Sequence, residues 1–229
     1  MNFLQYGCTD VIQTPVENPI SATWYHGTKS EPRFDQWICP PPPQDPLVVA
    51  HSALFFTSDL DFAKSAGENV CTVVLSGNAK LLVPAVESTG SRKLRRALRE
   101  SDRLSEHCIW LTDDKLWRQA WSTGDVMRFA FDNRRADSVA HYGAIMNFHM
   151  RQLREALTPT PPDELLSKIV RHNLTRGWIE KIVSVARSLG YQAIQGAEID
   201  RWTEPGRRPV ARPWLAVTDK SAISPPTWI

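Results

Sequence analysis

The stretch SATWYHGTKS, residues 21–30, places two aromatic residues directly before a His-Gly-Thr triplet. The aromatic residues favour a β-strand that ends near Gly27. Glycine carries no Cβ, so another group can approach its backbone closely, and His26 adds an imidazole at the same place. Two interpretations stay open: His26 packs in a core and Gly27 makes a turn, or both residues contact one small molecule.

The length and composition indicate a globular protein. With 229 residues, 42% hydrophobic and 23% charged, the chain fits one domain of generous size or a compact domain with an insertion. No apolar run approaches the roughly 20 residues of a membrane-spanning helix, so we expect no membrane partner. Residues 1–19 lack the basic start and apolar core of a signal peptide, which predicts a cytoplasmic protein, or one delivered into a host cell by dedicated machinery. The net charge of +2 is too small to imply a nucleic-acid partner.

The cysteines and histidines do not indicate a metal site. The four cysteines are scattered without CxxC spacing, which predicts free thiols and neither a disulfide framework nor a zinc site. His141, His149 and His172 lie in predicted helices at spacings that make no ligand pair on one turn. We therefore assign no metal.

Two groups of predicted strands flank a predicted helical segment. β-Branched and aromatic runs predict strands at 21–27, 52–58, 79–84 and 191–195, a strand closed by a Gly-Asn turn at 70–78, and a strand and turn at 214–223. A short helix is predicted at 58–67. Apolar periodicity predicts further helices at 91–104, 114–121, 137–157, 163–174 and 178–190. The fold class is therefore α+β, in a single domain over 1–229. Its strands lie in about 20–85 and 186–225, and a helical insertion covers about 90–185.

Three of these pieces occur in a characteristic order. The chain reads YHGTKSEPRFDQW at 25–37, then LFFTSDLDFAKSAGENVCTVVLSGNAKLL at 54–82, then LGYQAI at 189–194 and WLAVTDKSAI at 214–223. This order resembles the ADP-ribosyltransferase superfamily, in its His-Tyr-Glu branch of diphtheria toxin and the poly(ADP-ribose) polymerases, and is closer still to the YHGT enzymes of phages and mobile elements. The resemblance covers roughly 22–85 and 186–224. It implies a split β-sheet core with a helical insertion, and an enzyme that uses NAD as a co-substrate.

The resemblance also implies roles for residues of the first two motifs. His26 would hydrogen-bond a ribose hydroxyl of NAD, the backbone of Gly27 would pair with the nicotinamide carboxamide, and Thr28 would add a hydroxyl contact. Phe55 stands where the family has a tyrosine, and its ring would stack on nicotinamide. The imidazole of His26 and the ring of Phe55 should then face one cleft. The full set of residues expected to bind NAD is Tyr25, His26, Gly27, Thr28, Phe55, Phe56, Thr57 and Ala63.

The third motif departs from the family. Trp214 stands where the catalytic glutamate would begin the last strand, and an indole offers only a hydrogen-bond donor. Three explanations stay open: a carboxylate from Glu198, Asp200 or Glu204 enters the site, the target assists catalysis, or the fold binds NAD or ADP-ribose without turnover. We favour the first, with Glu198, because it directly follows the predicted strand at 191–195. The predicted catalytic residues are therefore His26, Phe55 and Glu198.

Arginines form two groups that could contact a phosphate or a target. Those of the predicted helix at 91–104 could grip a pyrophosphate or a nucleic-acid backbone, or simply face solvent. They are Arg92, Arg96, Arg99 and Arg103. The loop RWTEPGRRPVARP, residues 201–213, adds four arginines, and the resemblance favours it as the element that contacts the target.

The resemblance implies a mono-ADP-ribosyltransferase that moves ADP-ribose from NAD to a macromolecular acceptor, protein or nucleic acid, and releases nicotinamide. Such an enzyme would be a toxin, an effector or a phage-conflict protein, with an inhibitor or antitoxin as a further partner. Three alternatives stay open: a NAD- or ADP-ribose-binding module without catalysis, an RNA 2′-phosphotransferase-like enzyme, and an interaction protein whose helical insertion is the working surface.

Overall fold

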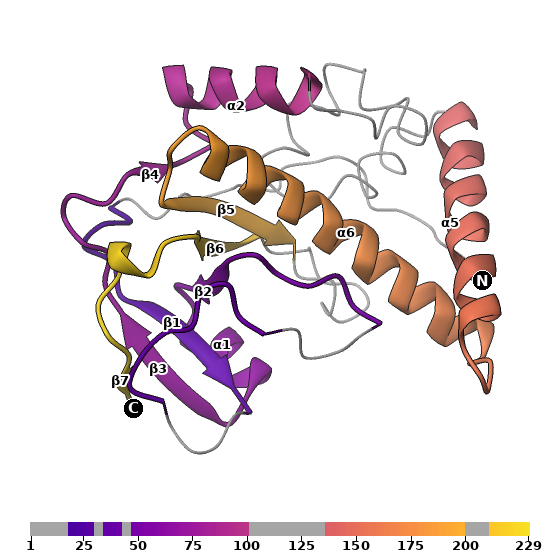
Figure 1. Cartoon of the computed structure of the whole chain (residues 1–229), viewed down its shortest axis with the longest axis horizontal. Helices are drawn as coiled ribbons and strands as arrows, with labels where there is room; N and C mark the ends of the chain where they lie inside the picture. The colour runs from indigo at the N-terminus through magenta and orange to yellow at the C-terminus, as the bar shows by residue number, and fades with distance from the viewer. Residues whose placement is uncertain (1–17, 30–33, 43–46, 101–135, 200–210) are drawn as a thin grey trace.

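The protein folds into one mixed β-sheet with long helices packed on one of its faces (Figure 1). The computed structural model describes residues 18–29, 34–42, 47–100, 136–199 and 211–229. These ranges contain, in order, β1 (Trp24–Thr28), β2 (Leu54–Thr57), α1 (Leu60–Ala66), β3 (Asn69–Val73), β4 (Leu81–Leu82), α2 (Thr89–Glu100), α5 (Ala136–Ala156), α6 (Asp163–Ser188), β5 (Ala193–Ile199), β6 (Ala211–Val217) and β7 (Thr227–Trp228). The predicted α+β class is confirmed.

The sheet is joined near its centre by a single residue pair. Its strand order is β4-β5-β6-β2-β1-β3-β7, antiparallel except between β4 and β5. β1 pairs with β3 over five residue pairs and β2 pairs with β6 over four, but β1 pairs with β2 only where Tyr25 lies opposite Thr57. We call this place the β1/β2 junction. His26 and Gly27 follow Tyr25 on β1, beyond the one pair that holds the two strands together.

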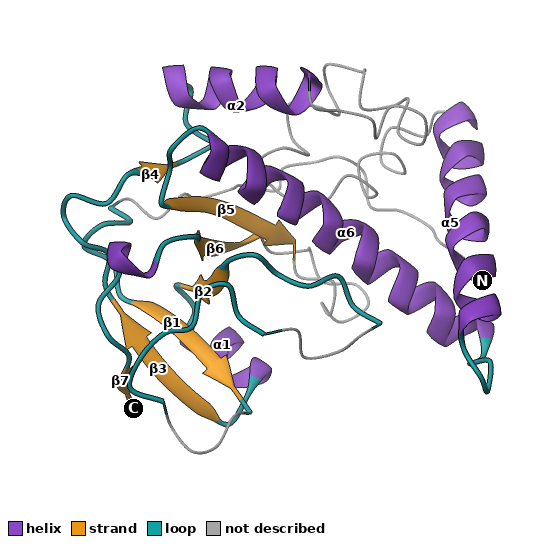
Figure 2. Ribbon diagram, in the orientation of Figure 1, coloured by secondary structure: helices purple, strands orange, loops and turns teal. Residues whose placement is uncertain are grey.

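Two hydrophobic clusters lie on opposite faces of the sheet. Successive residues of a strand point to opposite faces, so in β6 Ala216 belongs to one cluster and Leu215 to the other. The Ala216 cluster is completed by apolar residues of α2, α5 and α6, such as Leu94 and Ile182. The Leu215 cluster contains Trp37, from the segment before β2, and the residues that follow β6. Figure 2 shows the long helices above and beside β5 and β6, away from β1 and β3.

α6 is one continuous helix, where the sequence predicts two, at 163–174 and 178–190. Its 26 residues run through Gly177. Apart from the helix's own backbone and the two neighbouring residues, no atom of the described residues lies within 4 Å of the place where a Cβ would stand on that glycine. Ile179, Ile182 and Val183 are buried against the sheet. Packing on this side stabilises the helix by more than the roughly 1 kcal/mol that a glycine costs in a helix interior.

Each predicted strand has a counterpart in the sheet, and its bounds change near the third motif. β5 extends through Glu198, which the sequence places after the strand, and β6 begins at Ala211. β7 pairs with β3 and has no counterpart among the predicted strands. The predicted helix at 114–121 and residues 201–210 of the basic loop lie outside the described residues. Among the helices of the described ranges, none has both the length and the apolar character needed to cross a bilayer.

The cap of α1 connects the second motif to β6. The carboxylate of Asp59 accepts a hydrogen bond from the backbone N–H of Phe62 at 3.0 Å, and its other oxygen pairs with the guanidinium of Arg212. That guanidinium also lies over the ring of Phe62, 5.2 Å from its centroid. Asp59 therefore caps the first turn of α1 and also links this helix to β6.

We expect Asp59→Ala to lower the free energy of unfolding by about 1–2 kcal/mol, because it removes the cap and leaves Arg212 without this carboxylate. Asp61→Ala is the matched control. Asp61 lies in the same helix, its side chain is 94% exposed, and its ion pair with Lys64 is 3.9 Å long. Its loss should change stability by less than about 0.5 kcal/mol. Urea unfolding of both variants measures the difference, and equal effects would contradict the role given to Asp59.

Candidate functional site

His26 is held across the β1/β2 junction by a hydrogen bond to the second motif. Its Nδ1 lies 2.9 Å from the backbone carbonyl oxygen of Phe55, and its ring packs edge-on against Trp37 at 5.5 Å and beside Phe56 at 5.6 Å. Burial lowers the pKa of His26, and the hydrogen bond to Phe55 opposes this only in part. The imidazole is therefore neutral at pH 7.

The tautomer of His26 follows from this contact. A carbonyl oxygen can only accept, so Nδ1 carries the proton and Nε2 carries the lone pair. Within the described ranges, Nε2 has no hydrogen-bond partner. A hydroxyl group of a ligand is the kind of donor that this nitrogen can bind.

Gly27 lies where helix α1 approaches the sheet most closely. A Cβ on Gly27 would stand 1.8 Å from the backbone oxygen of Ala63, and a Cβ on Gly67 would stand 2.2 Å from the carbonyl carbon of Thr28. Any side chain at either position would push the helix and the strand apart. The structure thus brings Gly27 and Ala63 together, two residues that the sequence assigns to one site. It also shows that Gly27 is needed for packing, whether or not a ligand binds.

The two phenylalanines of the second motif point to opposite faces of β2. Phe56 is 3% exposed and lies in the cluster of Trp37, on the side where His26 packs. The ring of Phe55 lies on the other face, 4.2 Å from the ring of His51 and 5.7 Å from that of Trp214. His26 and Phe55 therefore meet through the Phe55 carbonyl, and their rings belong to different clusters, instead of facing each other as the sequence predicts. Alternation along a strand separates them.

The threonines of the two motifs are buried, and the hydroxyl of Thr57 is hydrogen-bonded within the protein. Thr57 is 6% exposed, and its hydroxyl donates to the carbonyl oxygen of Pro213 at 3.1 Å and accepts from the N–H of Asp59 at 3.2 Å. Thr28 is likewise buried, whereas Tyr25 is partly exposed. The hydroxyl of Thr57 therefore has a structural role that the sequence did not predict.

The third motif places an indole beside the junction. Trp214 lies opposite Thr57 on one side and Gly196 on the other, and a Cβ on Gly196 would stand 2.1 Å from the indole ring. The indole is buried, and its Nε1 has no hydrogen-bond partner in the described part of the chain. Glu198 lies within β5, two residues beyond Gly196, where the register pairs it with Arg212.

A histidine–glutamate pair that the sequence analysis missed lies beside Phe55. The Nδ1 of His51 is 2.5 Å from Oε1 of Glu180, and Oε2 of Glu180 accepts a hydrogen bond from the N–H of Ser52 at 2.8 Å. Burial acts to raise the pKa of Glu180, but the hydrogen bonds from His51 and Ser52 outweigh it and lower that pKa. The glutamate is therefore charged at neutral pH.

A sequence signal for this pair exists in α6. Asn173, Arg176 and Glu180 are spaced at i, i+3 and i+7, so they form one polar stripe along a helix whose apolar side packs in the core. Such a stripe indicates that a polar segment covers that side of the helix. The partner segment, which contains His51, is irregular and carries no periodicity by which to find it.

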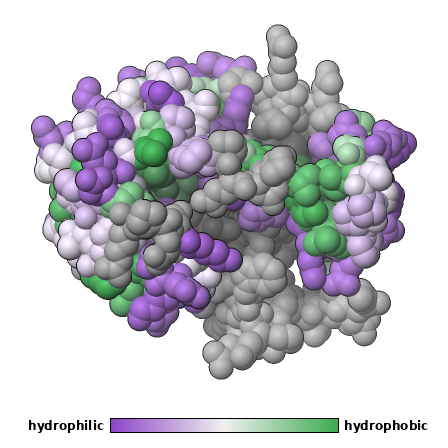
Figure 3. Space-filling model, turned by 60° about the horizontal axis from the view of Figure 1, so that its bottom comes forward, coloured by the Kyte–Doolittle hydropathy of each residue, from purple (hydrophilic) through white to green (hydrophobic). Residues whose placement is uncertain are grey.

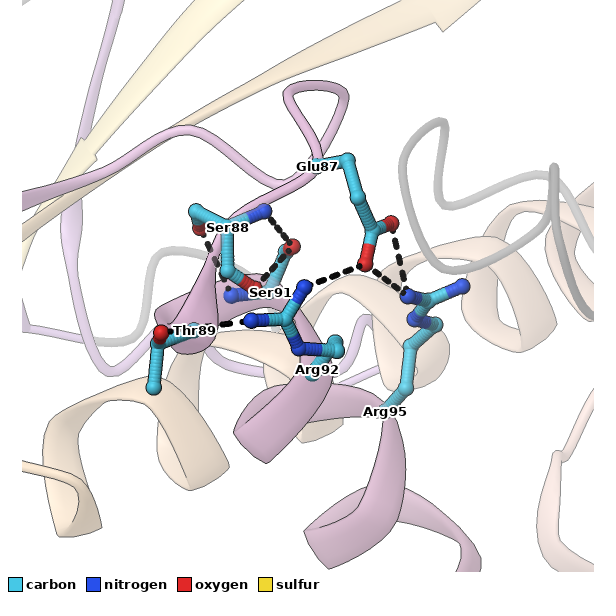
Figure 4. Close-up of polar contacts among 6 residues, drawn as sticks. All are labelled: Glu87, Ser88, Thr89, Ser91, Arg92 and Arg95. Atoms are coloured by element: carbon cyan, nitrogen blue, oxygen red, sulfur yellow. Dashed lines mark hydrogen bonds and ion pairs between the residues drawn. The ribbon is translucent and has the colours of Figure 1, made fainter.

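One arginine of the predicted stripe on α2, Arg92, shares a carboxylate with Arg95, which does not belong to the stripe. Figure 4 shows the carboxylate of Glu87 between two guanidinium groups, with Arg95 at 2.7 Å and Arg92 at 3.3 Å. Arg96 is exposed. Arg103 and the side chain of Arg99 lie outside the described part of the chain, as do Asp200 and Glu204. Of the stripe's side chains that the structure describes, Arg92 is therefore paired with Glu87 and Arg96 faces solvent.

Apolar side chains reach the surface on the paired helices α5 and α6. Figure 3 shows apolar surface gathered at that end of the molecule. Phe148 of α5 is 38% exposed and Leu165 of α6 is 48% exposed. Arg154 and Asp163, 2.6 Å apart, tie the end of α5 to the start of α6. The paired helices thus carry exposed apolar side chains beside an ion pair that links the two helices.

Comparisons with known proteins place the chain in no family. No family model, no curated protein and no solved structure matches it.

Proposed function

We propose that the chain is an ADP-ribosyltransferase that cleaves NAD at the β1/β2 junction and transfers ADP-ribose to a macromolecule. The order of the motifs YHGT, FFTS and WLAVTD supports this function. So does a sheet in which β1 and β2 share only one residue pair, because a split of this kind leaves the edge of β1 open to a ligand. The fold that we propose is accordingly the split-sheet core of that superfamily.

The observation that carries the proposal is the hydrogen bond from His26 to the carbonyl oxygen of Phe55. It joins the first motif to the second at the residue where the family has its tyrosine. It also fixes the imidazole with its lone pair on Nε2, the arrangement needed to accept a hydrogen bond from a ribose hydroxyl.

The neighbouring residues suit the remaining parts of NAD. Beyond Tyr25 the edge of β1 offers backbone N–H and C=O groups of Gly27 to the nicotinamide carboxamide. The ring of Phe55 offers an apolar face to the nicotinamide. In the reaction, the bond between nicotinamide and C1′ of the ribose breaks, its electron pair leaves with nicotinamide, and a nucleophile of the acceptor bonds to C1′. Positive charge develops on the ribose in between.

The acceptor that we propose is a protein or a nucleic acid of a target cell, which fits a toxin, an effector or a phage-conflict protein. The exposed apolar surface of α5 and α6, with Phe148 and Leu165, is the part of the described chain best suited to an inhibitor or antitoxin.

A second candidate function is binding of NAD or ADP-ribose without turnover. The observation in its favour is Trp214, whose buried indole stands where the family's glutamate would stabilise the developing charge. Glu198, which we predicted to replace that glutamate, lies on β5 two residues beyond Gly196, the residue opposite Trp214. The register places Glu198 opposite Arg212. Under this second candidate, NAD binds but is not consumed.

Incubation of the purified chain with NAD labelled in its adenine, in the presence of a cell lysate, separates the two candidates. We expect free nicotinamide to accumulate and the label to enter either the protein or the nucleic-acid fraction. NAD that binds the chain but stays intact supports the binding module and contradicts the transferase. Boiled chain is the control for lysate enzymes that consume NAD.

A further inference from the structure

We propose that His51 is the general base of the transfer reaction and that Glu180 positions it, an assignment that rests on the function proposed above. The pair lies in the segment before β2 and on α6, and neither residue belongs to the three motifs of the resemblance.

The geometry of the pair gives His51 a single tautomer. Glu180 is charged and therefore only accepts, so the Nδ1 of His51, 2.5 Å away, carries the proton. The second oxygen of the carboxylate is held by the N–H of Ser52, which fixes its orientation. The lone pair of His51 is thereby left on Nε2, and this nitrogen has no hydrogen-bond partner within the described ranges. A carboxylate that orients an imidazole in this way is the arrangement of a general base.

Three other hydrogen bonds already hold the segment before β2 to α6, so the pair is not needed for that purpose. The side chain of Asn173 donates to the carbonyl oxygen of Leu47 at 2.7 Å and accepts from the N–H of Val49 at 3.0 Å. Arg176 donates to the carbonyl oxygen of Val49 at 2.9 Å. These contacts hold the segment through its backbone alone. The imidazole of His51 adds a titratable group that fastening the segment does not require.

The pair also lies where the reaction takes place in the proposed function. The ring of His51 is 4.2 Å from that of Phe55, whose face we assign to nicotinamide. The side chain of His51 is 22% exposed, so solvent and an acceptor can reach it, whereas that of Glu180 is 14% exposed. Arg176, one turn earlier on α6, is another charged side chain that binds this segment. A base at this place is adjacent to the bond that breaks.

The chemical step is balanced within NAD, the acceptor and the pair. The acceptor X–H loses its proton to Nε2 of His51, and X bonds to C1′ of the ribose. The bond between C1′ and nicotinamide breaks, and its electron pair leaves with nicotinamide. His51 becomes an imidazolium, whose charge is stabilised by the carboxylate of Glu180, and it later releases the proton to solvent.

The test uses the full-length chain with NAD, with water as the acceptor, and measures nicotinamide release. We expect His51→Ala to lower kcat by about 10²-fold or more and to leave the KM for NAD within about twofold. Imidazole added to the buffer should restore part of the activity of this variant. Glu180→Gln should lower kcat by about 10-fold or more, again with little change in KM. Asn173→Ala is the matched control, because it removes two hydrogen bonds between α6 and the same segment but keeps the pair.

The outcomes distinguish a failure of the His51 and Glu180 assignment from a failure of the proposed function. If the wild-type chain releases nicotinamide and His51→Ala does so equally fast, the pair is not the base, while the transferase stands. The same holds if Asn173→Ala loses as much activity as Glu180→Gln, since the effect is then structural. If the wild-type chain binds NAD but releases no nicotinamide, either with water alone or with cell lysate as the source of acceptor, the proposed function fails and the assignment of His51 fails with it. Circular dichroism melting curves show whether each variant is folded.

Discussion

Gly27→Ala should lower the free energy of unfolding by about 3 kcal/mol or more. The added methyl group would stand 1.8 Å from the backbone oxygen of Ala63, and this neighbour is a helix backbone that cannot rotate away. Helix α1 would have to move off β1, and Gly67, which packs against the backbone of Thr28, would lose its contact as well. Thermal unfolding followed by circular dichroism should show a decrease in Tm of roughly 6–12 °C.

Gly177→Ala is the matched control for that variant. Gly177 lies inside α6, and outside this helix none of the described residues has an atom within 4 Å of its would-be Cβ, so the same substitution meets no obstacle from them. We expect it to stabilise the chain by about 0.5–1 kcal/mol, because alanine is the better helix former. A Gly27→Ala variant as stable as the wild-type chain would show that α1 does not pack on β1 at this distance.

His26→Asn should reduce nicotinamide release from NAD by about 10²-fold, the scale of losing a group that positions a substrate. The amide nitrogen of asparagine can take the place of Nδ1 and keep the hydrogen bond to the carbonyl oxygen of Phe55. The acceptor at Nε2 is lost. The variant therefore removes the proposed contact to the ribose while the β1/β2 junction is preserved. Steady-state kinetics with the purified chain measure the effect.

The pH dependence of stability provides an independent check on His26. Burial lowers its pKa, so in the pH range below about 6.5 the unfolded chain binds a proton that the folded chain does not. The stability from a neutral His26 is present above that pH and is lost as the pH falls through the folded pKa. His26→Asn should show a smaller loss of unfolding free energy between pH 7 and pH 5 than the wild-type chain. Parallel pH profiles of the two proteins would argue against a buried, neutral His26.

The sequence predicts the strands of the sheet well because their signals are local. The strands at 21–27 and 52–58 are found as β1 and β2, and the helix predicted at 58–67 is found as α1, capped by Asp59 and Gly67. Each depends on residues within a few positions of one another: aromatic runs, a capping carboxylate and a glycine. The continuity of α6 through Gly177 is not local, since it depends on packing against a sheet built from distant residues.

The candidate site is only partly predictable for the same reason. The sequence places His26, Gly27 and Phe55 in one site, and the structure brings them to the β1/β2 junction. The sequence does not reveal that the ring of Phe55 points away from His26. The face of β2 on which each ring lies depends on the register with β6. The pair of His51 and Glu180 joins residues 129 positions apart. The polar stripe of α6 indicates that a polar segment covers it, but no pattern in the segment of His51 shows which residues do so.

Calorimetric titration of NAD into the purified full-length chain tests the central claim most directly, because both a transferase and a binding module require a site for NAD at the β1/β2 junction. We predict saturable heat with a stoichiometry of one NAD per chain. A titration that gives no heat of binding at several temperatures, with the chain folded by circular dichroism, would contradict the account.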